Sequence, residues 1–80
     1  MKFEIFVTLK NEVLDPQGKA VEGALKNMGF DAISNIRQGK YFTLEVNESD
    51  EGKAIKMVKV SCEKLLANHT IENFKFNKIL

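Results

Sequence analysis

The chain has 80 residues, and its 12 Lys and Arg against 11 Asp and Glu give a net charge of +1. This balance provides no overall field that would attract nucleic acid or a membrane surface, so partners must be recognised by shape. Apolar residues make up 44 % of the sequence, which predicts a folded chain. A chain this short buries only about 60 % of its unfolded surface. We therefore expect a single domain over residues 1–80 that needs a partner chain for stability.

No apolar run approaches the roughly 20 residues of a membrane span, and the first residues lack the layout of a signal peptide. These patterns predict a cytoplasmic protein. The one cysteine, Cys62, has no second thiol with which to pair. Together with the one histidine, His69, it provides too few ligands for a structural zinc site. We expect neither a disulfide nor a bound metal.

Apolar and polar residues alternate from Lys2 to Leu9, which is the pattern of a strand with one buried face. The residues expected on that face are Phe3, Ile5, Val7 and Leu9. Phe6 falls on the opposite, polar face, where an aromatic ring is a candidate for contact with another chain. A ring partly covered by neighbouring lysine side chains is an equally good interpretation.

The segment from Asp15 to Gly29 is typical of a helix with both ends marked. Asp15 suits the N-cap, Pro16 suits the first helical position, and Gly29 provides the left-handed residue after the last turn. An apolar stripe along this helix predicts a face buried in the core. It consists of Ala20, Val21, Ala24, Leu25 and Met28.

The segment from Ala32 to Val46 is expected to be extended, but its alternation slips between Ile33 and Ile36. A hairpin turning at residues 37–40 would explain the slip, because Gly39 permits a tight turn there. One long strand with a bulge would explain it equally well.

A second helix is predicted over Glu51 to Ala67 and a last strand over Ile71 to Asn77, with Phe74 and Phe76 on one side. The expected buried face of this helix consists of Ala54, Ile55, Val58, Cys62 and Leu65, with Leu66 at its margin. The element order β-α-β(β)-α-β predicts an α+β, ferredoxin-like two-layer sandwich with two helices on one face of an antiparallel sheet. We expect dimerisation to extend this sheet.

No motif in the chain indicates an active site: there is no Gly-rich phosphate loop, no paired carboxylates and no nucleophile beside a histidine. The candidates for partner contact are Arg37, Lys40, Phe6 and Tyr41. Arg37 is the only arginine, and its planar fork suits a carboxylate or phosphate on a partner. A solvated turn is the plain alternative for this loop.

Several segments of the chain together resemble the PurS family, the small subunits of phosphoribosylformylglycinamidine synthase. The matching segments are Leu14-Asp15-Pro16-Gln17-Gly18 after the strand Phe6 to Lys10, Val21 to Gly29, Arg37-Gln38-Gly39-Lys40, and Leu65-Leu66-Ala67-Asn68 before Ile71-Glu72. They cover nearly the whole chain, and the Asp-Pro-Gln-Gly segment is the most specific. His69-Thr70 departs from the family, which usually has a proline after the Asn, and this affects only the local shape of the helix exit.

The resemblance implies a non-catalytic role in de novo purine synthesis, at the step that forms formylglycinamidine ribonucleotide from formylglycinamide ribonucleotide, glutamine and ATP. The implied partners are a large synthetase subunit, which uses ATP and Mg²⁺, and a glutaminase subunit. The small subunit is implied to bridge the two and to assist ammonia transfer. It is also implied to form a homodimer or a dimer of dimers and to bind no cofactor itself. From the near-neutral charge we expect neither a nucleic-acid nor a membrane partner.

Two alternatives come from other functional classes. The first is a small dimeric ferredoxin-like module that senses a ligand, with residues 11–18 as the binding loop. The second is an RNA-binding domain on a similar fold. The near-neutral charge and the lack of paired aromatics interleaved with Arg or Lys on a strand disfavour the RNA-binding domain.

Overall fold

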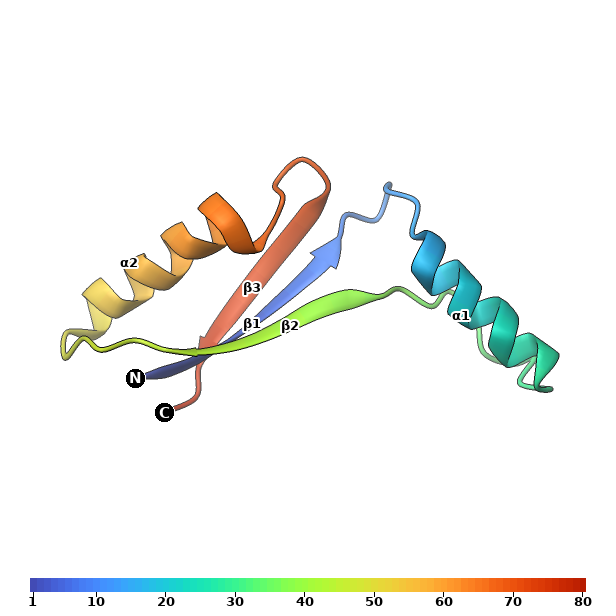
Figure 1. Cartoon of the computed structure of the whole chain (residues 1–80), viewed down its shortest axis with the longest axis horizontal. Helices are drawn as coiled ribbons and strands as arrows, with labels where there is room; N and C mark the ends of the chain where they lie inside the picture. Colours follow the sequence, from blue (N-terminus) through green and yellow to red (C-terminus); the bar gives the residue numbers. More distant parts are fainter.

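The computed structural model describes all 80 residues and shows a three-stranded sheet with two α-helices (Figure 1). In chain order the elements are β1 (Lys2–Leu9), α1 (Pro16–Asn27), β2 (Gly39–Glu45), α2 (Glu51–Ser61) continued by a π-helical turn η1 (Cys62–Leu66), and β3 (Glu72–Lys78). The central strand β1 runs antiparallel to both β2 and β3. The predicted α+β class, antiparallel sheet and order of elements are confirmed.

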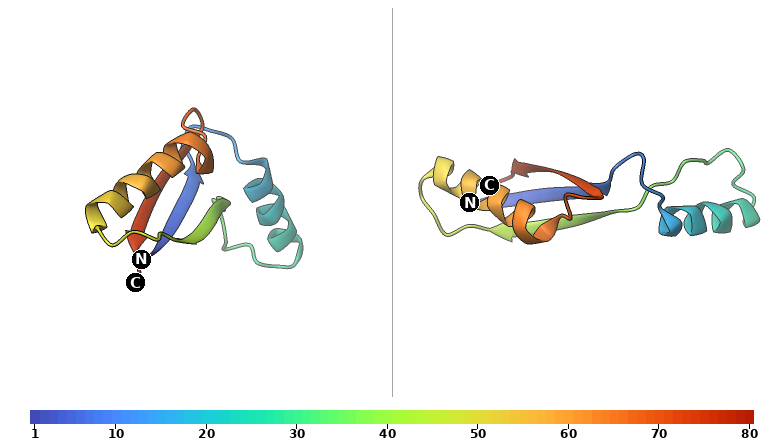
Figure 2. Two further views of the ribbon diagram at one scale, coloured as in Figure 1. Left: turned by 60° about the vertical axis from the view of Figure 1, so that its left-hand side comes forward. Right: turned by 90° about the horizontal axis from the view of Figure 1, so that it is seen from above.

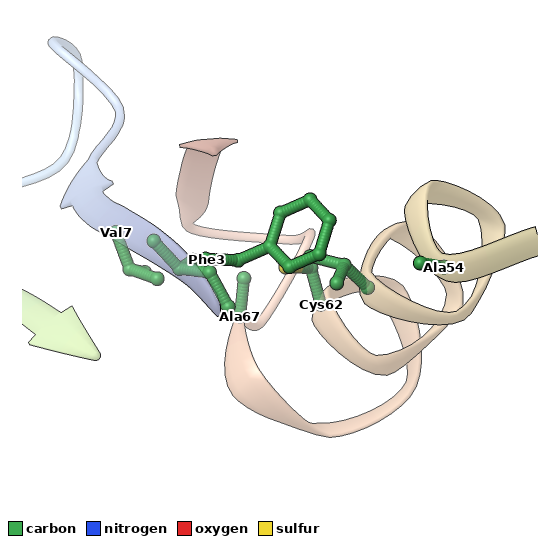
Figure 3. Packing of buried hydrophobic residues seen from close by; sticks show 7 residues of the cluster. Phe3, Val7, Ala54, Cys62 and Ala67 are labelled. Atoms are coloured by element: carbon green, nitrogen blue, oxygen red, sulfur yellow. The ribbon is translucent and has the colours of Figure 1, made fainter. Parts of the chain in front are cut away.

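The core lies between the sheet and α2, which covers one face of it (Figures 1 and 3). The buried cluster consists of Phe3, Ile5 and Val7 from β1 with Ala54, Val58, Cys62 and Ala67 from the α2 side. β2 and β3 lie on either side of β1 and are joined through α2, which gives a split β-α-β unit. The alternation of β1 is therefore explained by a single buried face, as predicted.

The last turn of α2 differs from the expected regular helix. The Ala67 N–H donates to the Cys62 carbonyl oxygen at 3.0 Å, five residues back instead of four. Each turn then holds more residues, so Leu66 turns toward the core while Leu65 points into solvent, 83 % exposed. The prediction that Leu65 and Ile55 lie on the buried face is wrong, because both are exposed.

The position of α1 also differs from expectation. Figures 1 and 2 show it beyond the end of the sheet instead of on the helix-covered face, and the molecule is correspondingly elongated, 50 × 26 × 14 Å. Gly18 is its only buried residue, and Val21 and Met28 of the predicted stripe are exposed. The expectation that α1 covers the sheet of its own chain is wrong, because an apolar stripe indicates that a face is covered without indicating by which chain.

The segment from Ala32 to Val46 forms neither a hairpin nor one long strand. Only Gly39–Glu45 is a strand, and residues 30–38 return along α1 without a strand partner (Figure 2). Gly29, with φ 94°, ends α1 as predicted. The slip in alternation therefore marks the point where the chain leaves α1 and enters the sheet.

Candidate partner-binding surfaces

Two segments connect α1 to the sheet, residues 10–15 on the way out and residues 36–39 on the way back, and we call them the neck. Asp15 is their main link. Its Oδ1 accepts from the Gly18 N–H at 2.9 Å, as an N-cap should, and its Oδ2 accepts from the Gln38 N–H at 2.6 Å. Asp15 is only 3 % exposed. One buried carboxylate thus fastens both the start of α1 and the segment that enters β2.

The hydrogen bonds from the Gly18 and Gln38 N–H groups, followed by the charge of Arg37, lower the pKa of Asp15 below its ordinary value. A carboxylate whose pKa is lowered by folding stabilises the fold above its unfolded pKa of about 3.9. This stabilisation is lost as the pH falls through the lowered, folded-state pKa. At neutral pH the Asp15 carboxylate is therefore ionised, and its full contribution to the stability of the neck is present.

Arg37, in the returning segment of the neck, holds the two segments together from the other side. Its Nη2 donates to the carbonyl oxygens of Lys10 and Val13, both at 2.9 Å, and so holds the outward segment against the returning one. Gln38 adds a bond from its Nε2 to Oε1 of Gln17 at 2.6 Å. Because these bonds run in both directions across the neck, α1 is held in a fixed direction relative to the sheet.

Gly18 makes this close approach possible. A Cβ at this position would collide with the carbonyl oxygen of Ile36 and lie 2.7 Å from Oδ2 of Asp15. The sequence reading identified Asp15 as a cap but missed both its second bond, to Gln38, and the role of Gly18. The available signal was a glycine inside the first turn of a helix, where it costs stability unless the backbone must approach another segment.

The second predicted surface is the outer face of the sheet, which no helix covers (Figure 1). Phe6 and Tyr41 are register partners there, with ring centroids 5.1 Å apart, and Lys75 Nζ lies 5.5 Å from the Phe6 centroid. The Tyr41 hydroxyl donates to Glu4 Oε1 at 3.0 Å, which raises the pKa of Tyr41. The structure thus brings two of the predicted contact residues together in one aromatic patch, in which Tyr41 is exposed and Phe6 is half-buried.

The other two predicted residues lie apart from this patch. Arg37 is in the neck, and Lys40 at the start of β2 forms an ion pair with Glu72 Oε2 of β3 at 3.3 Å. Lys40 Nζ also donates to the Leu66 carbonyl oxygen at 3.4 Å. Both bonds of Arg37 within the chain use Nη2, which leaves its other guanidinium donors for a partner.

The loop of residues 11–18, which the ligand-sensing alternative would use, is occupied by these internal bonds. The carbonyl oxygen of Val13 accepts from Arg37, and both carboxylate oxygens of Asp15 accept backbone N–H groups. Asn11 and Glu12 are exposed. These acceptor groups of Val13 and Asp15 are therefore engaged within the chain, while Pro16 and Gln17 line a cavity of about 270 Å³ together with Gln38, Lys40 and Glu72.

Few groups in the chain are equipped for chemistry. Cys62 is buried, and burial raises the pKa of its thiol, so it is a poor nucleophile. No cluster of three or more His, Cys, Asp or Glu side chains is placed to hold a metal ion. The helices are all too short or too polar to cross a membrane.

We expect Arg37→Ala to loosen the neck while leaving the sheet intact. Loss of two hydrogen bonds to exposed carbonyls should lower the free energy of unfolding by about 1 kcal/mol. Amide hydrogen exchange should speed up in residues 10–14 and in α1 and stay unchanged in β1. Arg37→Lys, which keeps the charge without the fork, serves as the matched variant. Unchanged exchange in the neck of Arg37→Ala would contradict this role.

Comparison with known proteins places these surfaces in context. The family model described as "PurS: Phosphoribosylformylglycinamidine (FGAM) synthase" matches residues 2–79. The chain is 44 % identical over 75 residues to the phosphoribosylformylglycinamidine synthase subunit PurS of Bacillus subtilis, covering 94 % of this chain and 88 % of that protein. It is 40 % identical over 74 residues to the Mycobacterium leprae subunit of the same name, covering 92 % and 90 %.

Solved structures agree with these matches. A crystal structure of Bacillus subtilis PurS superposes with a TM-score of 0.85 at 43 % identity, covering 95 % of this chain and 94 % of that one. A chain in the structure of PurLQS from Thermotoga maritima superposes with a TM-score of 0.89 at 33 % identity, covering 98 % and 95 %. The similarity in both sequence and structure extends over nearly the full length of each protein.

Proposed function

Since this chain belongs to the PurS family of phosphoribosylformylglycinamidine synthase, we propose that its task is to hold a synthetase and a glutaminase subunit together for ammonia transfer. The chain is a non-catalytic subunit of this enzyme of purine biosynthesis. The complex converts formylglycinamide ribonucleotide, glutamine and ATP into the amidine. We assign the ATP and Mg²⁺ that the complex uses to the large synthetase subunit.

The observation that supports the proposal is that a helix and one face of the sheet are left without cover from the chain itself. Such surfaces are suited to binding other subunits. α1 projects beyond the sheet, and no helix covers the outer face of the sheet (Figure 1). The aromatic pair of Phe6 and Tyr41 belongs to that face. Ammonia is readily protonated in water, so holding two active sites together and excluding water has chemical value without any reacting side chain. A subunit built of docking surfaces suits this task.

We assign the predicted contact residues to this assembly. The aromatic patch of Phe6 and Tyr41 combines apolar rings with polar edges, the composition enriched at the centre of protein interfaces. Arg37 and Lys40, at the neck end of the sheet, would add charged contacts at its rim. The complex formed in this way would contain the chain as a homodimer in the cytoplasm.

The test is the rate of amidine synthesis by purified synthetase and glutaminase subunits, with and without this chain. We expect glutamine-dependent synthesis to require the chain, because it couples the two active sites. Synthesis driven by added ammonia should proceed without it, which controls for damage to the synthetase. Equal glutamine-dependent rates in its absence would overturn the coupling role.

A Phe6→Ser, Tyr41→Ser double variant probes the aromatic patch in the same assay. Both rings lie on the uncovered face, so the sheet core is left in place. The variant should need a higher concentration to restore glutamine-dependent synthesis. Leu65→Ser, which removes an exposed apolar side chain elsewhere on the surface, is the matched control.

A further inference from the structure

The cavity of about 270 Å³ beside the neck lies at the end of the sheet nearest α1 (Figure 1). Its lining comes from the end of β1, the first turn of α1 with its cap, the start of β2 and the start of β3. The polar residues of the lining are Asp15, Gln17, Gln38, Lys40 and Glu72. Segments that are distant in the sequence thus meet around one small, polar cavity.

Two side-chain amides line the cavity on the side of the neck. Nε2 of Gln38 donates to Oε1 of Gln17 at 2.6 Å. This bond leaves the other half of each amide, Nε2 of Gln17 and Oε1 of Gln38, without a hydrogen-bond partner in the chain. A free amide donor close to a free amide acceptor is the complement of a carboxamide, which has one acceptor oxygen and one NH₂ donor group.

An ion pair lines the cavity on the side of the sheet. Nζ of Lys40 lies 3.3 Å from Oε2 of Glu72, and the two side chains are 50 % and 12 % exposed. Charge-assisted N–H···O bonds are usually about 2.7–2.9 Å long, so this pair is loose. The ammonium and the carboxylate each keep hydrogen-bonding capacity beyond the pair. Together they are the complement of the α-carboxylate and α-ammonium groups of an amino acid.

Charge and size narrow the class of ligand further. The lining holds two carboxylates, of Asp15 and Glu72, against the one ammonium of Lys40, which disfavours a phosphate or another multiply charged anion. Pockets for drug-sized ligands measure about 300–1,000 Å³, so this cavity suits a smaller molecule. A zwitterion of the size of a single amino acid meets both conditions.

We propose that this cavity binds a free amino acid with a side-chain amide, such as the glutamine that the complex consumes. The α-carboxylate lies at Lys40 and the α-ammonium at Glu72, while the side-chain amide pairs with Gln17 and Gln38. The ligand is bound and released unchanged, since the cavity holds no nucleophile. Binding is a property of this chain alone and does not rest on the coupling role.

A ligand in this position connects α1 to the sheet. Gln17 is in the first turn of α1, whereas Lys40 and Glu72 belong to β2 and β3. The bound amino acid therefore adds contacts to the hydrogen bonds that Asp15 and Arg37 already make across the neck. The direction of α1 would then be held more firmly when glutamine is plentiful, which gives this chain a means of responding to a substrate of the complex.

The first part of the test is a titration of the full chain with L-glutamine, followed through its backbone amide signals by NMR. We expect saturable shifts at residues 16–18, 38–40 and 72, with a dissociation constant of about 1 mM because the site is small and open. L-Glutamate, which lacks the amide donor, and glutaramate, which lacks the α-ammonium, should each bind about tenfold more weakly. Absence of saturation with glutamine, or equal affinities for the three compounds, would overturn the proposal.

The second part uses variants of the lining. Gln17→Ala removes an exposed amide and should weaken glutamine binding about three- to tenfold, whereas Lys19→Ala, exposed on the same helix outside the cavity, is the matched control. Glu72→Gln should weaken binding of glutamine but not of glutaramate, which has no ammonium to pair with the carboxylate. A general disturbance of the cavity would weaken both ligands. Equal losses for both, or equal binding by Gln17→Ala and Lys19→Ala, would refute this site.

Neither part needs the other subunits or catalytic activity. A chain that binds glutamine in this cavity but fails to support glutamine-dependent synthesis would contradict the coupling role alone. A chain that supports synthesis but does not bind glutamine would contradict the amino-acid site alone. The two proposals therefore fail separately.

Discussion

Phe3→Ala should remove a large part of the protein's stability at room temperature. Phe3 is fully buried on the central strand and contacts Phe76 edge to face, with ring centroids 6.4 Å apart. Truncating a buried Phe costs about 3–5 kcal/mol. Small domains have only about 5–15 kcal/mol of stability in total, and this chain has a core of seven buried apolar residues with little in reserve. The measurement is urea unfolding followed by circular dichroism.

Phe6→Ala is the matched control, because the two residues are the same type and lie on the same strand. Phe6 points to the outer face, where its half-buried ring lies against Tyr41 and near Nζ of Lys75. Its loss should cost about 1 kcal/mol, the order of a single aromatic pair. If the two variants were equally stable, the assignment of the buried face of β1 would be wrong.

Gly18→Ala is expected to open the neck. The added Cβ would collide with the Ile36 carbonyl oxygen and crowd the Asp15 carboxylate, so the backbone of one segment must move. Overpacking of this kind costs about 1–3 kcal/mol. We expect lower stability and faster amide exchange at residues 36–38, with exchange in β1 little changed.

Gly23→Ala provides the control within the same helix. A Cβ at position 23 meets nothing within 4 Å, and alanine favours helix over glycine by about 0.5–1 kcal/mol. Gly23→Ala should therefore stabilise the chain or leave it unchanged, in the opposite direction to Gly18→Ala. Equal effects from both substitutions would mean that helix propensity, and not the contact with Ile36, decides the role of Gly18.

Local features of the fold could be predicted from the sequence because they depend on neighbouring residues. The strand Lys2–Leu9 follows from strict alternation, and the start of α1 follows from Asp15 capping and Pro16 at the first position. Gly29 ends α1 for the same kind of reason. In each case the residues that determine the structure lie within a few positions of the element they determine.

Features that depend on distant segments were not predicted. The position of α1 depends on bonds across the neck between residues 21 or more apart, such as Gln17 with Gln38 and Asp15 with Gln38. The exposure of Leu65 depends on one shifted hydrogen bond in the last turn of α2, which hydrophobic periodicity does not record. The contact of Phe6 with Tyr41 depends on the register of β1 against β2. Candidate residues could be named, but the sequence did not show which of them meet.

Because the hydrogen bonds of the neck fix the base of α1, a small change at the neck moves the far end of the helix much further. A helix of 12 residues is about 18 Å long, at about 1.5 Å per residue. A rotation of about 10° at its base would therefore displace its tip by about 3 Å, which is enough to change which side chains its last turn contacts. A few atoms around Asp15 and Gly18 thus determine where side chains two to three turns away arrive. Substitutions in those few residues would be magnified with distance, whereas substitutions at the tip would act only where they occur.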